Sequence, residues 1–354
     1  MSAKEISEEI NQSRRRFVST AAVAIAATQF GVPGSMSAET SKAMQAGAAS
    51  PESGTSASYG PLKQINAGLL NVGYAEAGPS DGKPVVLLHG WPYDIYSFVD
   101  VAPILAAAGY RVIVPYLRGF GTTQFLSSET FRNGEQVVFA IDIIALMDAL
   151  KIKSAIVGGF DWGTRTANIM AALWPERVKG LVSVSGYGIP NVKANAQPLP
   201  PAAEHFWWYQ FYFITERGRA GYDKYRHDFN KLIWQLASPK WNFSDATYDR
   251  TAASFNNPDH VDITIRNYRC RYNWQDKGDP QYADLEDKVQ QFPALSLPTI
   301  TIASDFDGAG AAGTAYRSKF TGKYDHRILP GIGHNVPQEA PQAFAKAVID
   351  VDAF

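Results

Sequence analysis

The chain has 354 residues, of which 45% are hydrophobic and 19% are charged, and its formal net charge is −1 at pH 7. This is the balance of a globular protein that can fill a core, and it lacks the excess positive charge typical of proteins whose main partner is nucleic acid. The single cysteine, Cys270, excludes an intrachain disulfide.

The beginning of the chain has the layout of an export signal. Three arginines, Arg14 to Arg16, precede an Ala-rich apolar stretch from Phe17 to about Val32, and small residues follow. The order of charged, apolar and small residues is typical of a cleaved signal peptide. The apolar stretch is shorter than the roughly 20 residues that a membrane-spanning helix needs. We therefore expect no stable membrane insertion once the signal has been removed.

The run from Ser13 to Val18 resembles the bacterial twin-arginine signal. The resemblance implies that the twin-arginine export machinery is a partner and that the protein acts in the periplasm or outside the cell. We expect a signal peptide over residues 1–38, with cleavage near Ala38 or near Ala48. Residues 39–60 are rich in Ser, Ala, Gly and Thr and predict a flexible linker.

From residue 61 onward, short apolar runs alternate with helix-length amphipathic stretches. This alternation predicts a mostly parallel sheet with helices on both faces, which is an α/β fold. The expected strands are 85–88, 111–114, 155–158, 178–185, 299–302 and 327–329. The expected helices are 98–108, 136–150, 164–174 and 341–351.

The alternation is interrupted between about Gly188 and Pro293. This region holds five of the eight tryptophans, many tyrosines and no strong strand pattern. We therefore expect a helical cap over residues 188–293, inserted between two pieces of one α/β core at 61–187 and 294–354.

The segment Gly159-Phe160-Asp161-Trp162-Gly163 lies between an expected strand and an expected helix. Its form, G-x-D-x-G, is that of the sharp turn that presents a nucleophile in G-x-S-x-G proteins. The start of the helix favours an anion, so we expect Asp161 to be ionised at neutral pH. A carboxylate attacks saturated carbon better than it attacks an amide carbonyl. The substrate is therefore expected to be an epoxide or an alkyl halide. In the competing interpretation, Asp161 only caps the helix.

The segment Gly331-Ile332-Gly333-His334-Asn335 predicts a loop after a strand, with glycines beside the histidine. His334 is the candidate general base that activates water to hydrolyse the alkyl ester. A carboxylate is needed to orient it, and the order nucleophile, acid, histidine favours Asp307, with Asp305 as the alternative.

The segment His89-Gly90-Trp91-Pro92 follows the first expected buried strand. We expect the backbone N–H groups of Trp91 and Trp162 to form an oxyanion hole for the ester formed on Asp161.

Together, HGWP, GFDWG and GIGHN, in this order and with an insertion after the strand over 178–185, resemble the epoxide hydrolase branch of the α/β-hydrolase superfamily, which is related to the haloalkane dehalogenases. The sequence departs from the family pattern at Tyr116, Phe160 and Thr164, where aspartate, histidine and glycine are common. The resemblance implies an α/β-hydrolase fold and two cap tyrosines that protonate the epoxide oxygen. Their motifs fall on Tyr209 and Tyr268, with Tyr212 and Tyr272 as alternatives.

Three functions follow from these residues. The first is opening of an epoxide to a diol through an ester on Asp161. The second is dehalogenation by the same nucleophile, with the indoles of Trp162 and of Trp207 or Trp208 holding the halide. The third is ligand binding without turnover on a hydrolase scaffold. The aromatic cap favours a small apolar substrate, and neither a metal-ligand cluster nor a phosphate-binding glycine loop is present in the sequence, so we expect no cofactor.

Overall fold

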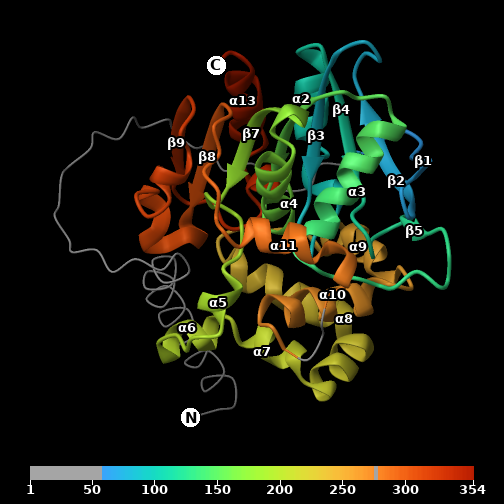
Figure 1. Ribbon diagram of the computed structural model, residues 1–354, viewed down its shortest axis with the longest axis vertical. Coiled ribbons are helices and arrows are strands. Elements are labelled where there is room, and N and C mark those ends of the chain that lie inside the picture. Colours follow the sequence, from blue (N-terminus) through green and yellow to red (C-terminus); the bar gives the residue numbers. More distant parts are fainter. Residues whose placement is uncertain (1–57, 275–277) are drawn as a thin grey trace.

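The computed structural model describes residues 58–274 and 278–354 (Figure 1). The predicted signal peptide over residues 1–38, and all of the predicted linker except residues 58–60, lie outside the described residues. Within the described part of the chain, no helix combines the length and the apolar character that are needed to cross a membrane.

A nine-stranded sheet forms the centre of the fold, with the strand order β1-β2-β4-β3-β6-β7-β8-β9 and with β5 paired to β2 (Figure 1). Every pair that involves β2 is antiparallel, and the other pairs are parallel. This mostly parallel sheet confirms the predicted α/β class. The strands are β1 Lys63–Ala67, β2 Leu70–Ala77, β3 Lys83–Leu88, β4 Tyr110–Pro115, β5 Gln124–Phe125, β6 Ala155–Gly159, β7 Val178–Val184, β8 Thr299–Ser304 and β9 Tyr324–Leu329.

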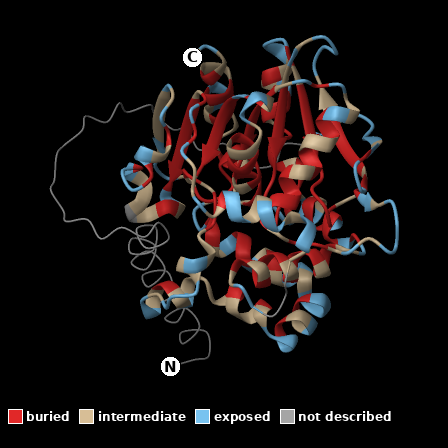
Figure 2. Ribbon diagram, viewed as in Figure 1, coloured by how far each residue is buried: buried red, intermediate tan, exposed pale blue. Residues whose placement is uncertain are grey.

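The central strands are buried on both faces, as their continuous apolar runs predict. In β3, the residues from Val85 to Leu88 are at most 1% exposed, and all five residues of β6 are buried. Figure 2 shows the buried residues concentrated along these strands. The edge strand β1 is mostly exposed and has no apolar run, which is why the sequence patterns did not single it out.

Helices cover both faces of the sheet. Successive residues of a strand point to opposite faces, and a Cβ at Gly158 would meet Phe344 of α13, whereas one at Gly159 would meet Gly163 of α4. Helix α2 packs with α13 on one face, and α3 packs with α4 on the other. The helices of the core are α2 Val101–Ala107, α3 Gln136–Ala149, α4 Trp162–Leu173, α12 Val336–Glu339 and α13 Pro341–Asp352.

The region between β7 and β8 is helical in its described residues, and most of its helices gather at one end of the sheet (Figure 1). Its last helix, α11 Ala283–Val289, packs against α3 and α4 of the core. The other helices are α5 Val192–Asn195, α6 Pro201–Phe206, α7 Trp208–Ile214, α8 Glu216–Ala237, α9 Asp245–Ala252 and α10 His260–Arg271.

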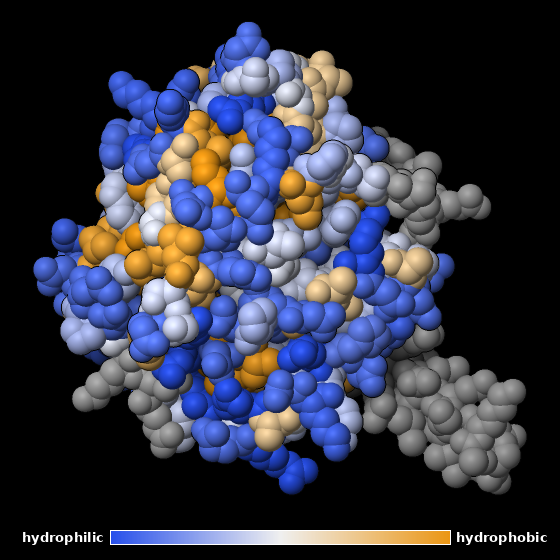
Figure 3. Space-filling view, turned by 90° about the vertical axis from the view of Figure 1, so that its right-hand side faces the viewer, coloured by the Kyte–Doolittle hydropathy of each residue, from blue (hydrophilic) through white to orange (hydrophobic). Residues whose placement is uncertain are grey.

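Figure 3 presents the side of the molecule on which β1, β2 and β5 lie. Its apolar side chains form separate patches divided by hydrophilic ones. Exposed Leu62, Leu69 and Leu126 flank these strands. Such scattered apolar residues are ordinary on a protein surface and by themselves indicate no binding face.

Candidate active site

Asp161 lies at the apex of a sharp turn between β6 and α4. Its backbone has φ 52° and ψ −120°, a conformation that non-glycine residues rarely adopt. The turn packs so closely on the end of β3 that a Cβ at Gly163 would lie 1.9 Å from the carbonyl oxygen of Leu88. A Cβ at Gly90 would lie 2.3 Å from the Cβ of Asp161. Only glycine fits at these two positions, which explains the glycines of both motifs.

The carboxylate of Asp161 is held from two sides. Its Oδ1 accepts a hydrogen bond of 2.8 Å from the backbone N–H of Trp91, and its Oδ2 lies 3.4 Å from Nε2 of His334. Nη2 of Arg165 lies 3.8 Å from the same Oδ2. Burial raises the pKa of Asp161, but His334, Arg165 and the Trp91 N–H outweigh it and lower the pKa to about 2. The carboxylate is therefore ionised at neutral pH.

His334 lies in the loop between β9 and α12, and this loop is anchored to the cap. Its backbone N–H donates to Oγ of Ser238 at 2.9 Å and to the carbonyl of Ala237 at 3.2 Å. The imidazole packs against the ring of Phe306 in a tilted arrangement, with ring centroids 4.0 Å apart. Nδ1 is buried and has no hydrogen-bond partner among the described residues.

The two candidate acids lie in different surroundings at the end of β8. Asp307 is buried, its Oδ2 accepts a hydrogen bond of 2.8 Å from the N–H of Ser304, and burial raises its pKa. Asp305 is exposed and pairs with Lys240 at 2.5 Å. The charge of His334 partly offsets the effect of burial on the pKa of Asp307, although no hydrogen bond joins Asp307 to Nδ1.

Tyr209 of α7 and Tyr268 of α10 pack against each other and against the indole of Trp91. Their ring centroids are 5.8 Å apart, and each lies 5.3 Å from that of Trp91. Burial raises the pKa of both phenols, and the charge of Asp161 raises it further, so both are protonated at neutral pH. Of the alternatives, Tyr212 stacks on Phe229, whereas Tyr272 donates a hydrogen bond of 2.8 Å to the side chain of Gln210.

The indoles take up different places around the site. Trp91 donates its Nε1–H to the hydroxyl of Tyr222 at 2.9 Å. Trp162 begins α4 and packs against Tyr268, and Trp207 lines the pocket. The Nε1 atoms of Trp162 and Trp207 are both buried, and neither has a hydrogen-bond partner among the described residues.

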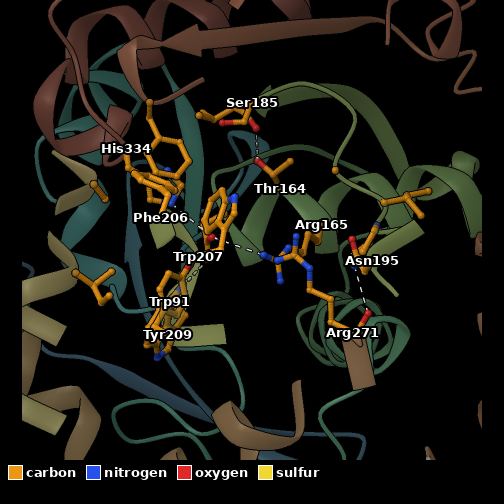
Figure 4. Close-up of a pocket in the computed structure, with 18 of the residues that line it drawn as sticks. Trp91, Thr164, Arg165, Ser185, Asn195, Phe206, Trp207, Tyr209, Arg271 and His334 are labelled. Carbon is orange, nitrogen blue, oxygen red and sulfur yellow. Dashed lines mark hydrogen bonds and ion pairs between the residues drawn. The ribbon is translucent and has the colours of Figure 1, made fainter. Parts of the chain in front are cut away.

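A pocket opens over Asp161 between the core and the cap, and Figure 4 shows the side chains around it. The described part of the chain holds no group of three or more His, Cys, Asp or Glu side chains arranged to bind a metal. The pocket is lined by Trp91, Asp161, Arg165, Phe206, Trp207, Tyr209, Ile233, Arg271, Phe306 and His334, among others.

Sequence reasoning missed two residues that contact the candidate site. Arg165 follows Asp161 by one helical turn, and the spacing of four residues at the start of a helix was a signal for this pair. Glu339 accepts hydrogen bonds from Ser238 and from the backbone on either side of His334. An acidic residue at the end of a four-residue helix is usually in contact with solvent, so nothing in the sequence indicated that Glu339 is buried.

The fold and the site together define the class of this protein. A model of the alpha/beta hydrolase fold family matches residues 83–341, and the chain belongs to that family. Within it, the chain lies in the epoxide hydrolase-like branch, related to the haloalkane dehalogenases. The resemblance found in the three motifs is thus confirmed.

The individual relatives include a protein named epoxide hydrolase and a protein named haloalkane dehalogenase. Over 158 residues the chain is 33% identical to epoxide hydrolase B of Mycobacterium tuberculosis strain H37Rv, which covers 41% of this chain and 44% of that protein. Over 142 residues it is 32% identical to a haloalkane dehalogenase of Mycobacterium marinum, which covers 39% of this chain and 44% of that protein. The chain thus matches less than half of the length of these curated relatives.

A solved structure is similar over a longer stretch. It comes from Klebsiella pneumoniae subsp. pneumoniae MGH 78578, and its protein is provisionally named an epoxide hydrolase. The two sequences are 58% identical, the similarity covers 83% of this chain and 97% of that one, and the TM-score is 0.81.

Proposed function

We propose that this protein is an exported epoxide hydrolase that forms an ester on Asp161 and releases a diol. One observation carries the proposal. The ionised carboxylate of Asp161 faces a pocket with one oxygen on the Trp91 N–H and the other 3.4 Å from the imidazole of His334. A carboxylate between an amide donor and a histidine suits attack on carbon followed by hydrolysis.

The first step is ring opening. Because Oδ1 of Asp161 is held by the Trp91 N–H, Oδ2 is the oxygen that attacks the epoxide carbon. A carbon–oxygen bond forms on Oδ2 as the ring carbon–oxygen bond breaks, and the released ring oxygen takes a proton from Tyr209 or Tyr268. Both phenols are protonated at neutral pH and pack against the indole of Trp91. The backbone N–H of the same residue holds Oδ1 of Asp161.

The second step is hydrolysis of the ester. His334 takes a proton from a water molecule, whose oxygen attacks the ester carbonyl carbon. The negative charge that develops on Oδ1 is stabilised by the N–H of Trp91, and by that of Trp162 in our proposal. The bond between Cγ and Oδ2 then breaks, and protons return to the diol and to the tyrosine. In this scheme Asp307 stabilises the protonated imidazole through its charge.

A single turnover in heavy-oxygen water tests the mechanism. Because the bond to Cγ breaks, the first diol carries an oxygen of Asp161 and no label, whereas later turnovers release labelled diol. Label in the first product would show that water attacks the epoxide directly and would overturn the role of Asp161.

A second candidate function is dehalogenation by the same nucleophile. Trp207 lines the pocket, and its buried indole nitrogen has no hydrogen-bond partner within 58–274 and 278–354; this favours dehalogenation, because such a donor can hold a halide. Incubation with styrene oxide and, separately, with a bromoalkane distinguishes the two functions. Diol without bromide supports epoxide hydrolysis, and bromide supports dehalogenation. Saturable binding without either product would support a ligand-binding protein.

Export rests on the twin-arginine pattern at Arg14 and Arg15. In a bacterial host, the full chain should reach the periplasm, and the double substitution of both arginines by lysine should keep it in the cytoplasm. Equal periplasmic amounts of the two proteins would contradict the proposal.

A further inference from the structure

The wall of the pocket opposite His334 is positively charged. Apart from His334, the charged side chains among its described lining residues are Asp161, Arg165 and Arg271, so cations outnumber carboxylates. Figure 4 shows Arg165 and Arg271 close together on this wall, away from His334. Burial and the charge of Arg271 both lower the pKa of Arg165, which is the electrostatic sign of two neighbouring cations.

Arg165 has hydrogen-bonding capacity that the part of the chain described by the structure does not use. Its side chain is 13% exposed, and Nη1 is buried with no hydrogen-bond partner among the described residues. Its Nη2 lies 3.8 Å from Oδ2 of Asp161, which is longer than a hydrogen bond. A buried charged donor without an acceptor is costly, so the geometry indicates that a ligand supplies the acceptor.

We propose that the pocket takes an epoxide with a carboxylate next to the ring, held by Arg165, an inference that rests on the proposed epoxide hydrolysis. A planar guanidinium matches a carboxylate in shape and charge. Because Nη2 of Arg165 lies 3.8 Å from the attacking oxygen, the anionic group of the substrate lies close to the carbon that is attacked.

The arrangement also solves an electrostatic difficulty of that substrate. Two carboxylates, one on Asp161 and one on the substrate, repel each other when they approach within a few ångströms. A guanidinium beside both of them offsets this repulsion. The aromatic side chains of Phe206, Trp207 and Tyr209 and the side chain of Ile233 leave room for an apolar body on the same molecule. The substrate is then apolar at one end, as the aromatic cap predicted, and anionic beside the ring.

The test compares two epoxides with the same carbon skeleton, 3-phenylglycidate and the neutral alcohol 3-phenylglycidol. The wild-type protein should have the higher kcat/KM for the anion. In Arg165→Met, this preference should fall roughly ten- to hundredfold, mainly through KM for the anion. Arg165→Lys should restore part of it. Arg226→Met is the matched control, because Arg226 pairs with Asp223 on α8 and does not line this pocket; it should leave the preference unchanged.

A measurement on the unmodified protein makes the test independent of the variants. Phenylacetate should inhibit competitively at concentrations at which phenylacetamide does not. An equal loss of kcat/KM for both epoxides in Arg165→Met, or equal inhibition by phenylacetate and phenylacetamide, would overturn the proposal. Arg165 would then act only through its charge beside Asp161. Failure of the wild-type protein to open any epoxide would instead overturn the proposed function.

Discussion

The hydroxyl of Ser238, at the end of α8 in the cap, donates a hydrogen bond of 2.6 Å to Glu339 in α12 of the core. Glu339 also accepts bonds from the backbone N–H groups of Gly333, at 2.7 Å, and Asn335, at 3.0 Å. These two residues flank His334. One buried carboxylate thus fixes the loop that carries His334, the proposed base, and ties it to the cap.

Replacing Glu339 with glutamine should therefore destabilise the protein, because the amide nitrogen cannot accept the bonds that one carboxylate oxygen accepts. We expect the free energy of unfolding to fall by about 1–3 kcal/mol, measured with urea, and kcat to fall with it. Gln338→Glu on the same short helix is the control and should leave both unchanged. Unaltered stability and kcat in Glu339→Gln would remove this anchoring role.

Asp161→Asn should lower kcat by about 10⁴-fold or more, because an amide is a far weaker nucleophile than the ionised carboxylate. The measurement is diol formation with an epoxide that the wild-type protein turns over. Circular dichroism and unfolding should match those of the wild type. A variant that keeps a tenth of the activity would exclude Asp161 as the nucleophile.

His334→Gln should permit attack but slow hydrolysis, because glutamine cannot take a proton from water. Mass spectrometry should then find the mass of one epoxide molecule added to the peptide that contains Asp161. The double variant with Asp161→Asn should carry no adduct. Loss of activity without an adduct in the single variant would place His334 in another role.

Tyr209→Phe and Tyr268→Phe should each lower kcat roughly 10- to 100-fold, and their combination should cost more, because each phenol can donate to the ring oxygen. Steady-state kinetics with an epoxide gives these values. Tyr225→Phe, on an exposed part of α8, is the control. A larger loss in Tyr212→Phe or Tyr272→Phe than in these variants would transfer the role to the alternative tyrosine.

The rate of ester formation should be independent of pH between about 5 and 9. The pKa of Asp161 is lowered to about 2, so the nucleophile stays ionised throughout this range. The pKa values of Tyr209 and Tyr268 are raised above the usual 10, so the proton donors stay protonated. Rapid-quench measurement of the first turnover checks this. A tenfold loss of the ester-forming rate for each pH unit below 7 would contradict it.

The sequence predicted the turn around Asp161 well because backbone geometry constrains those residues strongly. Any Cβ at Gly90, Gly159 or Gly163 would lie only 1.9–2.4 Å from a neighbouring atom, so the glycines of the motifs follow directly from the fold. The parallel strands were predictable for the same kind of reason, since burial on both faces leaves a continuous apolar run. Strand β1 lies at an edge of the sheet, where polar side chains can stay in contact with solvent. It therefore has no continuous apolar run.

Side-chain partners across the fold could not be predicted in this way. The sequence favours Asp307 over Asp305, but it cannot show that Asp307 is bound by the Ser304 N–H while Phe306 lies against the imidazole of His334. Those relations depend on how one loop folds over another. The role of Arg165 likewise depends on which face of α4 meets the cap.

The cap is inserted between two strands that pair directly, with Leu181 of β7 opposite Thr299 of β8. A ribosome that adds about 5–20 residues each second takes on the order of ten seconds to synthesise the intervening segment. During that time the edge of β7 that later pairs with β8 is unpaired, and it can pair with other chains. The cap helices form from local contacts and can therefore fold early. Their folding would shorten the distance between the ends of the inserted segment and bring β8 to that edge. Nascent-chain aggregation is therefore expected to peak at lengths that end within the cap.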